Sequence, residues 1–120
     1  MIKVSYFLRR LPGWTPRAFL EYWRESHAAL IRRHAETFGI VRYVQIHPHP
    51  HPRNEPSAAF PDPCDGIAEL WFRDEAALNE WFENRSAAAR AAGKAIRADE
   101  RKFIDRAHSP LLVGREEPIL

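Results

Sequence analysis

The segment from Phe19 to Phe38 constrains the fold more than any other part of the chain, because its apolar residues recur with the period of an α-helix. At about 100° of rotation per residue, Trp23, Leu30 and Phe38 all fall within about 100° of Phe19 around the helix axis. The opposite side carries charged residues, namely Arg17, Glu21, Arg24, Glu25, Arg32 and Glu36. The segment therefore predicts a long amphipathic helix that packs one face against the rest of the protein.

Both ends of this helix carry termination signals. The hydroxyl of Thr15 can cap the first turn, and Pro16 suits the first helical position, where its missing N–H leaves no hydrogen bond unmade. Gly39 favours the left-handed conformation that commonly ends a helix. We therefore predict one helix from residue 16 to about residue 38.

Two histidines, His27 and His34, lie within the apolar stripe of this helix. They are about 10.5 Å apart along the axis, which is too far for a shared metal ion but suits one elongated pocket. Because an imidazole can take up and return a proton near neutral pH, we interpret His27 as a candidate general acid and base. The alternative is a core histidine that is hydrogen-bonded to a strand. We expect His34 mainly to pack, and to line the same pocket.

The rest of the chain predicts four strands and further helices. The strands are expected at residues 2–9, 40–47, 66–72 and 111–113. Asp74 and Ser86 are candidate caps of two helical segments, Gly93 is expected to end the second, and residues 94–104 again suit a helix. The order βαββαβ in one domain, residues 1–120, predicts an α+β, ferredoxin-like fold. Its antiparallel four-stranded sheet would carry the helices on one face.

The predicted sheet has apolar residues on both faces. Val4 and Phe7 point to opposite faces of the first strand, and Leu70 and Trp71 do the same in the third. The helices cover one face, so the other face needs a second cover. A second copy packed sheet against sheet is the simplest cover, and we predict a homodimer through this face.

The composition excludes several classes of function. The net charge is +2 and acidic residues alternate with basic ones, so we expect no nucleic-acid partner. Charged residues interrupt every apolar run, so we expect no membrane span or membrane partner. Cys64 is the only cysteine, and the first residues lack a signal-peptide pattern, so we expect a cytoplasmic location.

Val41, Tyr43, Gln45 and His47 share one face of the second predicted strand. The last three can present a phenol, an amide and an imidazole to one ligand, or can satisfy each other within a half-buried strand. Aromatic side chains commonly stack on planar ligands. We expect a small hydrophobic or aromatic ligand, with ligand contacts from Tyr6, Trp23, His34, Gln45, His47 and Trp71.

His47, His49 and His51 alternate with prolines at the start of a proline-rich stretch, residues 48–65, which predicts an irregular loop. Imidazoles on one side of an extended segment can bind zinc, nickel or copper. No cysteine or carboxylate ligand stands beside them, so we expect a solvated loop and no metal site.

Three blocks of sequence together resemble the EthD family. They are Tyr22-Trp-Arg-Glu-Ser-His27-Ala-Ala-Leu30 after Pro12-Gly-Trp-Thr-Pro16, then Arg42-Tyr-Val-Gln-Ile-His47, then Ala98-Asp-Glu-Arg-Lys-Phe103-Ile-Asp. The resemblance covers nearly the whole chain and implies a dimeric α/β barrel, in which ferredoxin-like protomers pair through their sheets. It places the motif histidine of the family at His27. It also implies action on aromatic or polyketide compounds by His and Tyr, without a metal or organic cofactor.

Two functions of different classes follow. The first is a small cofactor-free lyase, cyclase or isomerase acting on an aromatic or polyketide-like molecule, with His27 as general acid and base and Tyr43 assisting. The second is a non-catalytic dimeric binder or shuttle of hydrophobic small molecules that accompanies an oxygenase pathway, with aromatic degradation as the expected setting. A third hypothesis is haem or metal binding through exposed histidines. On physical grounds we expect Asp99 and Glu100 to be solvent-facing helix charges.

Overall fold

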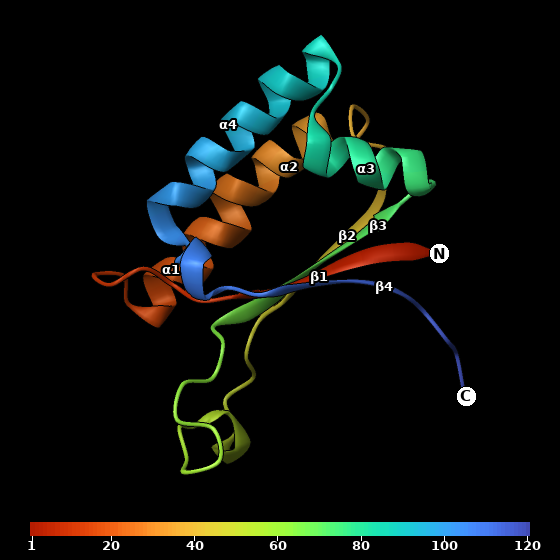
Figure 1. Cartoon of the computed structure of the whole chain (residues 1–120). Coiled ribbons are helices and arrows are strands. Elements are labelled where there is room, and N and C mark those ends of the chain that lie inside the picture. Colours follow the sequence, from red (N-terminus) through yellow and green to blue (C-terminus); the bar gives the residue numbers. More distant parts are fainter.

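The computed structural model describes residues 1–120 and has the predicted α+β architecture. One antiparallel four-stranded sheet has the strand order β2-β3-β1-β4, and Figure 1 shows the helices on one side of it. The strands are β1 (Ile2–Leu8), β2 (Ile40–Ile46), β3 (Gly66–Phe72) and β4 (Leu111–Arg115). The α-helices are α1 (Pro16–Tyr22), α2 (Ala28–His34), α3 (Glu75–Glu83) and α4 (Ala87–Phe103). Shorter turns are η1 (Trp23–His27), η2 (Pro52–Asn54) and η3 (Arg106–His108).

The first helical segment is interrupted, whereas the sequence predicts one regular α-helix. Thr15 caps α1 as predicted, since its hydroxyl accepts the N–H of Ala18 at 3.1 Å. Between α1 and α2, η1 is a π-helical turn, in which the N–H of Ala28 bonds the carbonyl of Trp23 five residues earlier. Such π-turns often occur at functional sites, and this one ends at His27.

The segment also ends earlier than predicted. Helix α2 stops at His34, and the chain turns over residues 35–39 before β2 begins. Gly39 takes the left-handed conformation with φ of +62°, as its predicted stop role requires. A Cβ atom on this residue would lie 2.7 Å from the Cβ atom of Ala77, so α3 also packs against this turn.

Helix α4 is continuous, so the prediction that Gly93 ends a short helix is wrong. Gly93 instead permits a close approach, because a Cβ atom there would lie 1.6 Å from Oδ1 of Asn84. Asn84 ends α3 in the left-handed conformation, with φ of 53°. Asp74 and Ser86 cap α3 and α4 through side-chain oxygens, as predicted. The end of α3 is therefore held directly against the middle of α4.

A β-bulge near Ile40 changes which side chains of β2 face the helices. Ile40 pairs with Phe72, and Tyr43 pairs with Leu70, so both lie on the helix-facing side of the sheet. Val41 falls out of the pairing and is 54% exposed. Val41 and Tyr43 therefore do not share a face, contrary to the simple alternation expected from the sequence.

The core lies between the helices and the sheet. Its most completely buried side chains are Trp23, Phe19, Phe38, Phe72, Phe103, Leu8 and Val4. Each such burial stabilises the fold by roughly 1.5–3 kcal/mol before entropy is subtracted. No helix combines the length and the hydropathy that a bilayer crossing requires.

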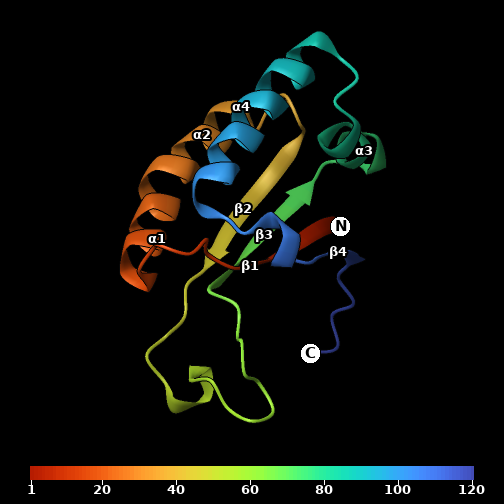
Figure 2. The ribbon, with the colours of Figure 1, turned by 60° about the vertical axis from the view of Figure 1, so that its left-hand side comes forward.

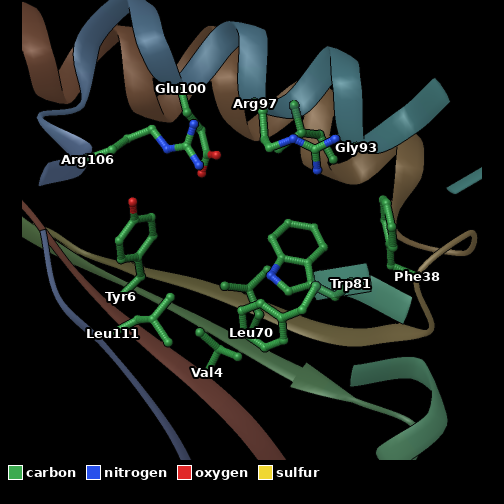
Figure 3. A pocket seen from close by; sticks show the side chains of 12 residues that line it. Val4, Tyr6, Phe38, Leu70, Trp81, Gly93, Arg97, Glu100, Arg106 and Leu111 are labelled. Carbon is green, nitrogen blue, oxygen red and sulfur yellow. The ribbon is translucent and has the colours of Figure 1, made fainter. Parts of the chain in front are cut away.

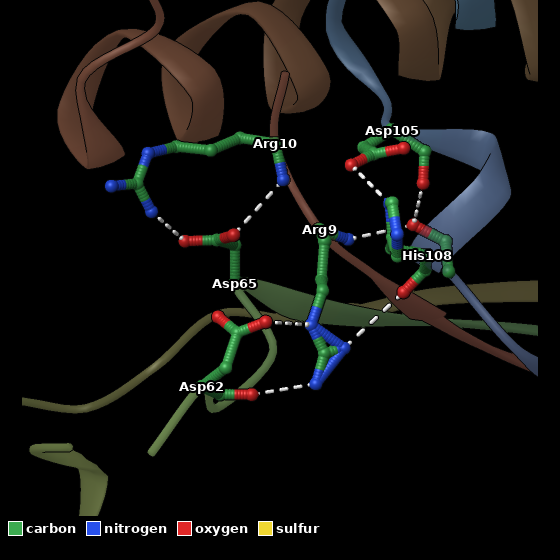
Figure 4. Close-up of polar contacts among 7 residues, drawn as sticks. Arg9, Arg10, Asp62, Asp65, Asp105 and His108 are labelled. Atoms are coloured by element: carbon green, nitrogen blue, oxygen red, sulfur yellow. Dashed lines mark hydrogen bonds and ion pairs between the residues drawn. The ribbon is translucent and has the colours of Figure 1, made fainter. Parts of the chain in front are cut away.

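The proline-rich stretch between β2 and β3 is an irregular extension, as predicted, and projects beyond the sheet away from α3 and α4 (Figure 2). Its second half is tied to the end of β1, as Figure 4 shows. Nε of Arg9 donates to Oδ2 of Asp62 at 3.0 Å, and the backbone N–H of Arg10 donates to Oδ2 of Asp65 at 2.9 Å. Arg9 also donates to the carbonyl of His108 at 3.2 Å, which links the extension to η3.

Replacing Gly93 by Ala is expected to destabilise the protein by about 1–3 kcal/mol, because the added methyl group collides with Asn84. The double variant with Asn84→Gly should be more stable than the two single effects imply, since glycine removes the colliding side chain and accepts the left-handed backbone. Denaturant unfolding followed by circular dichroism measures these differences. A Gly93→Ala variant as stable as the parent would contradict the close contact.

Candidate functional site

A cleft between the helices and the sheet contains two neighbouring cavities, with volumes of about 200 Å³ and 20 Å³. The larger cavity lies between α4 and the sheet and is shown in Figure 3. The smaller cavity includes His27 of η1 in its wall. Both cavities are lined by Tyr6, Leu70, Trp81 and Glu100, so they are adjoining compartments of one site.

His27 is paired with Asp99 of α4. Nδ1 of His27 lies 2.8 Å from Oδ2 of Asp99, and the hydroxyl of Tyr22 donates to the other carboxylate oxygen. His27 is 4% exposed, and the side chain of Asp99 is 13% exposed. Because an ionised carboxylate only accepts hydrogen bonds, Nδ1 carries the proton and Nε2 keeps its lone pair. The pair thus holds the imidazole in the tautomer that a general base requires.

The local charges support this protonation state. Burial lowers the pKa of His27, and the hydrogen bond and negative charge of Asp99 only partly oppose this effect. Burial alone would raise the pKa of Asp99, but hydrogen bonds from Tyr22 and His27, together with nearby positive charge that includes Lys102, outweigh it and lower the pKa below its ordinary value. At neutral pH a neutral imidazole therefore faces an ionised carboxylate.

Glu100, the next residue on α4, lies in an environment that shifts its pKa in the opposite direction. Its carboxyl reaches both cavities and has no hydrogen-bond donor to stabilise the ionised form. Burial raises the pKa of Glu100 to about 7, and the positive charges of Arg106 and Arg97 offset only part of this rise. Glu100 can therefore exchange a proton near neutral pH, as a catalytic acid must.

Tyr43 and Gln45 of β2 and His47, which follows the strand, form a chain of hydrogen bonds. Nε2 of Gln45 donates to the hydroxyl of Tyr43 and to the carbonyl of Trp23, both at 2.9 Å. Oε1 of Gln45 accepts from Nε2 of His47 at 2.8 Å, and the ring of His47 stacks on Trp23 with a centroid separation of 4.9 Å. Gln45 and His47 therefore hold the π-turn against β2, whereas Tyr43 reaches the cavity.

Of the eight residues that the sequence analysis assigns to the site, the structure places four in the wall of a cavity. The residues that line a cavity are Tyr6, Trp23, His27 and Tyr43. His34 and Trp71 line neither cavity. Trp71 belongs to the opposite face of the sheet, where Lys3 and Arg42 lie 4.3 Å and 4.6 Å from its ring centroid.

The expectation that Asp99 and Glu100 face solvent is wrong, and these are the two site residues that sequence reasoning missed. The sequence does contain a pattern that places both carboxyls on the buried face of the helix. Ile96, Asp99, Glu100 and Phe103 have the i, i+3, i+4, i+7 spacing of one helix face. Ile96 and Phe103 are buried, so the two carboxyls between them are also turned inward.

His47, His49 and His51 do not converge on one point. His47 is engaged by Gln45, and Nδ1 of His51 accepts the backbone N–H of Arg53 at 3.0 Å within the loop. No three His, Cys, Asp or Glu side chains are placed to hold a metal ion together.

Comparisons with known proteins identify similar sequences and folds. The model of the EthD domain family matches residues 11–107. The conidial pigment biosynthesis dehydratase EthD of Metarhizium robertsii is 29% identical over 117 residues, covering 92% of this chain and 79% of that protein.

Two solved structures resemble the fold. An ethyl tert-butyl ether d (EthD) family protein from Bacillus halodurans C-125 matches with a TM-score of 0.64 and 23% identity, over 98% of this chain and 99% of that chain. HapK from Hahella chejuensis matches with a TM-score of 0.63 and 11% identity, over 98% and 93% of the two chains. At these identities the two structures support the fold alone.

Asp99→Asn is expected to lower the pKa of His27 further, because it removes the negative charge that favours the imidazolium. An NMR titration of the histidine side chains measures this change. The matched control is Asp105→Asn, which removes a carboxylate 2.8 Å from Nδ1 of His108 and should leave the titration of His27 unchanged. Identical His27 titrations in the parent and in Asp99→Asn would contradict the pairing.

Proposed function

The chain belongs to the EthD family, and from this premise we propose that it is a cofactor-free enzyme acting on an aromatic or polyketide-like small molecule. One observation carries the proposal: His27, paired with Asp99, lines a cavity that is also lined by the carboxyl-bearing Glu100. We propose dehydration as the reaction, because the relative from Metarhizium robertsii bears the name of a dehydratase.

The proposed step is a β-elimination of water. Nε2 of neutral His27 takes a proton from the carbon next to a carbonyl group. The electrons of that C–H bond form a carbon–carbon double bond as the C–O bond of the β-hydroxyl breaks. Protonated Glu100 gives its proton to the leaving hydroxyl, so water is released. His27 then releases its extra proton to solvent and Glu100 takes one up, which returns the enzyme to its starting state.

The opposite pKa shifts of the two groups suit these roles. The pKa of His27 is lowered, so the imidazole is neutral and able to accept a proton, whereas the pKa of Glu100 is raised to about 7, so a protonated carboxyl remains available. Enzymes commonly assign the roles of acid and base to two groups whose pKa values are shifted in opposite directions. The smaller cavity, about 20 Å³, is large enough for one water molecule beside them.

Tyr43 and Asp99 support the reacting groups. Burial raises the pKa of Tyr43 to about 12, so its hydroxyl stays protonated and can donate to the oxygen that gains negative charge when carbon loses its proton. Asp99 does not touch the substrate in this scheme. It acts through His27 by fixing the tautomer and the orientation of the ring.

We also propose that the protein is a homodimer paired through the outer face of the sheet. The strand register places Ile46, Ile67 and Phe7 side by side across β2, β3 and β1 on this face, and Leu112 of β4, which pairs with Ser5, lies on the same face beside this apolar row. Leu112 is 61% exposed and Ile46 is 43% exposed in the single chain. A second copy would cover this row.

His27→Ala is expected to slow dehydration at least roughly tenfold with folding intact, because the general base is lost. A suitable substrate is a β-hydroxy tetralone, whose dehydration product tautomerises to a fluorescent naphthol. The rate should fall at acidic pH as His27 becomes protonated and fall again above about pH 7 as Glu100 ionises. Appearance of the naphthol, measured against buffer alone, gives the rate.

His34→Ala is the matched control, since this histidine lies in the same helical segment but lines neither cavity. Its rate should equal that of the parent. Full activity of His27→Ala would remove this residue from the mechanism. Saturable binding without naphthol formation would favour a carrier over an enzyme.

Leu112→Glu is expected to convert the dimer to a monomer, because it places a charge beside the apolar row that the second copy covers. Val113→Glu is the control, because Val113 is also exposed, at 45%, but its side chain points to the other face of the same strand. Light scattering at micromolar concentration measures the mass. A monomeric parent protein would reject the dimer.

A further inference from the structure

The larger cavity combines apolar walls with positive charge. Eight of its twelve lining residues are hydrophobic, yet Arg97, Glu100 and Arg106 also line it. Figure 3 shows Arg106 and Glu100 extending toward each other above the hydroxyl of Tyr6, with Arg97 further along α4. Arg97 donates from Nη1 to Oδ1 of Asn84 at 3.1 Å. Neither guanidinium lies within ion-pair distance of a carboxylate.

Glu100 cannot balance these charges. Burial raises its pKa to about 7, so at neutral pH a large share of the molecules carry an uncharged carboxyl. Even when Glu100 is ionised, it offsets only one of the two guanidinium charges. At least one positive charge beside this mostly apolar cleft therefore has no partner carboxylate. Arg106 is exposed and Arg97 is half-buried, so both guanidinium groups remain available to a bound anion, which would supply the missing partner charge.

We propose that the larger cavity binds a carboxylate carried on a planar, largely apolar molecule, with Arg106 and Arg97 as the residues that recognise the carboxylate. A guanidinium group can hold a carboxylate through two parallel hydrogen bonds. Trp81, Phe82 and Leu111 line the same cavity and offer apolar surface to the planar part. This inference rests on the proposed function only in naming its substrate class, an aromatic or polyketide-like acid.

The placement of Glu100 links this site to the proposed chemistry. Glu100 lines both cavities, whereas His27 lines only the smaller one. A molecule anchored by its carboxylate in the larger cavity would therefore extend past Glu100 toward His27. The two arginines would determine which molecules bind and how they are oriented, and would take no part in proton transfer.

Isothermal titration calorimetry with naphthoate and with naphthamide, its neutral analogue of the same shape, tests the proposal. The parent protein is expected to bind naphthoate at least roughly tenfold more tightly than naphthamide, as a charge-assisted contact implies. Arg106→Gln should abolish this preference, and Arg97→Gln should reduce it. Both variants should bind naphthamide about as well as the parent, because the apolar walls are unchanged.

Arg101→Gln is the matched control, because it removes the same charge from an exposed position of α4 outside the cavity. It should keep the preference for naphthoate, and circular dichroism should show all variants folded. Equal affinity for the two compounds, no binding of naphthoate, or an equal effect of Arg101→Gln would overturn the proposal.

Turnover of the neutral β-hydroxy tetralone is a separate measurement. If naphthoate is preferred but no tetralone is dehydrated, the proposed reaction fails and the carboxylate site stands. If the tetralone is dehydrated but naphthoate is not preferred, the carboxylate site fails and the reaction stands.

Discussion

The hydrogen bond between His27 and Asp99 is the interaction on which the candidate site depends. It joins groups 72 residues apart in the chain and connects the π-turn of the first helical segment to α4. It also sets the protonated nitrogen of the imidazole, and so determines which nitrogen is available for chemistry. The ring of Phe103 packs against the edge of His27, with a centroid separation of 5.1 Å, so apolar packing restricts the same ring. The hydrogen bond and the packing together hold the imidazole of His27 in one orientation.

Two neighbouring carboxyls on α4 show how strongly position controls charge. Hydrogen bonds from Tyr22 and His27 lower the pKa of Asp99, whereas burial without a hydrogen-bond donor raises that of Glu100 to about 7. The two residues are consecutive, so helix geometry turns them about 100° apart. One points to the first helical segment and the other to the cavities. The same residue class can therefore serve as a positioning group and as a proton donor within one turn.

Regular periodicity predicted the fold but not every local feature. The order of the strands and helices along the chain and the caps at Thr15, Asp74 and Ser86 follow from local sequence patterns. The π-turn, the β-bulge and the continuous passage of α4 through Gly93 do not, because each depends on a contact with a distant element. A glycine that ends a helix and a glycine that admits a neighbouring side chain look the same in sequence.

The sequence alone determined the βαββαβ order and the amphipathic first helix and singled out His27 as a candidate, because these depend on periodicity, caps and a local motif. Only the tertiary structure decided that Asp99 is the partner of His27 and that Glu100 enters the cavities with Arg97 and Arg106. It also separated Trp71 from the site by placing it on the opposite face of the sheet. The physical reason is that hydrogen bonding, desolvation and charge balance depend on distances between residues far apart in the chain, which local patterns do not contain.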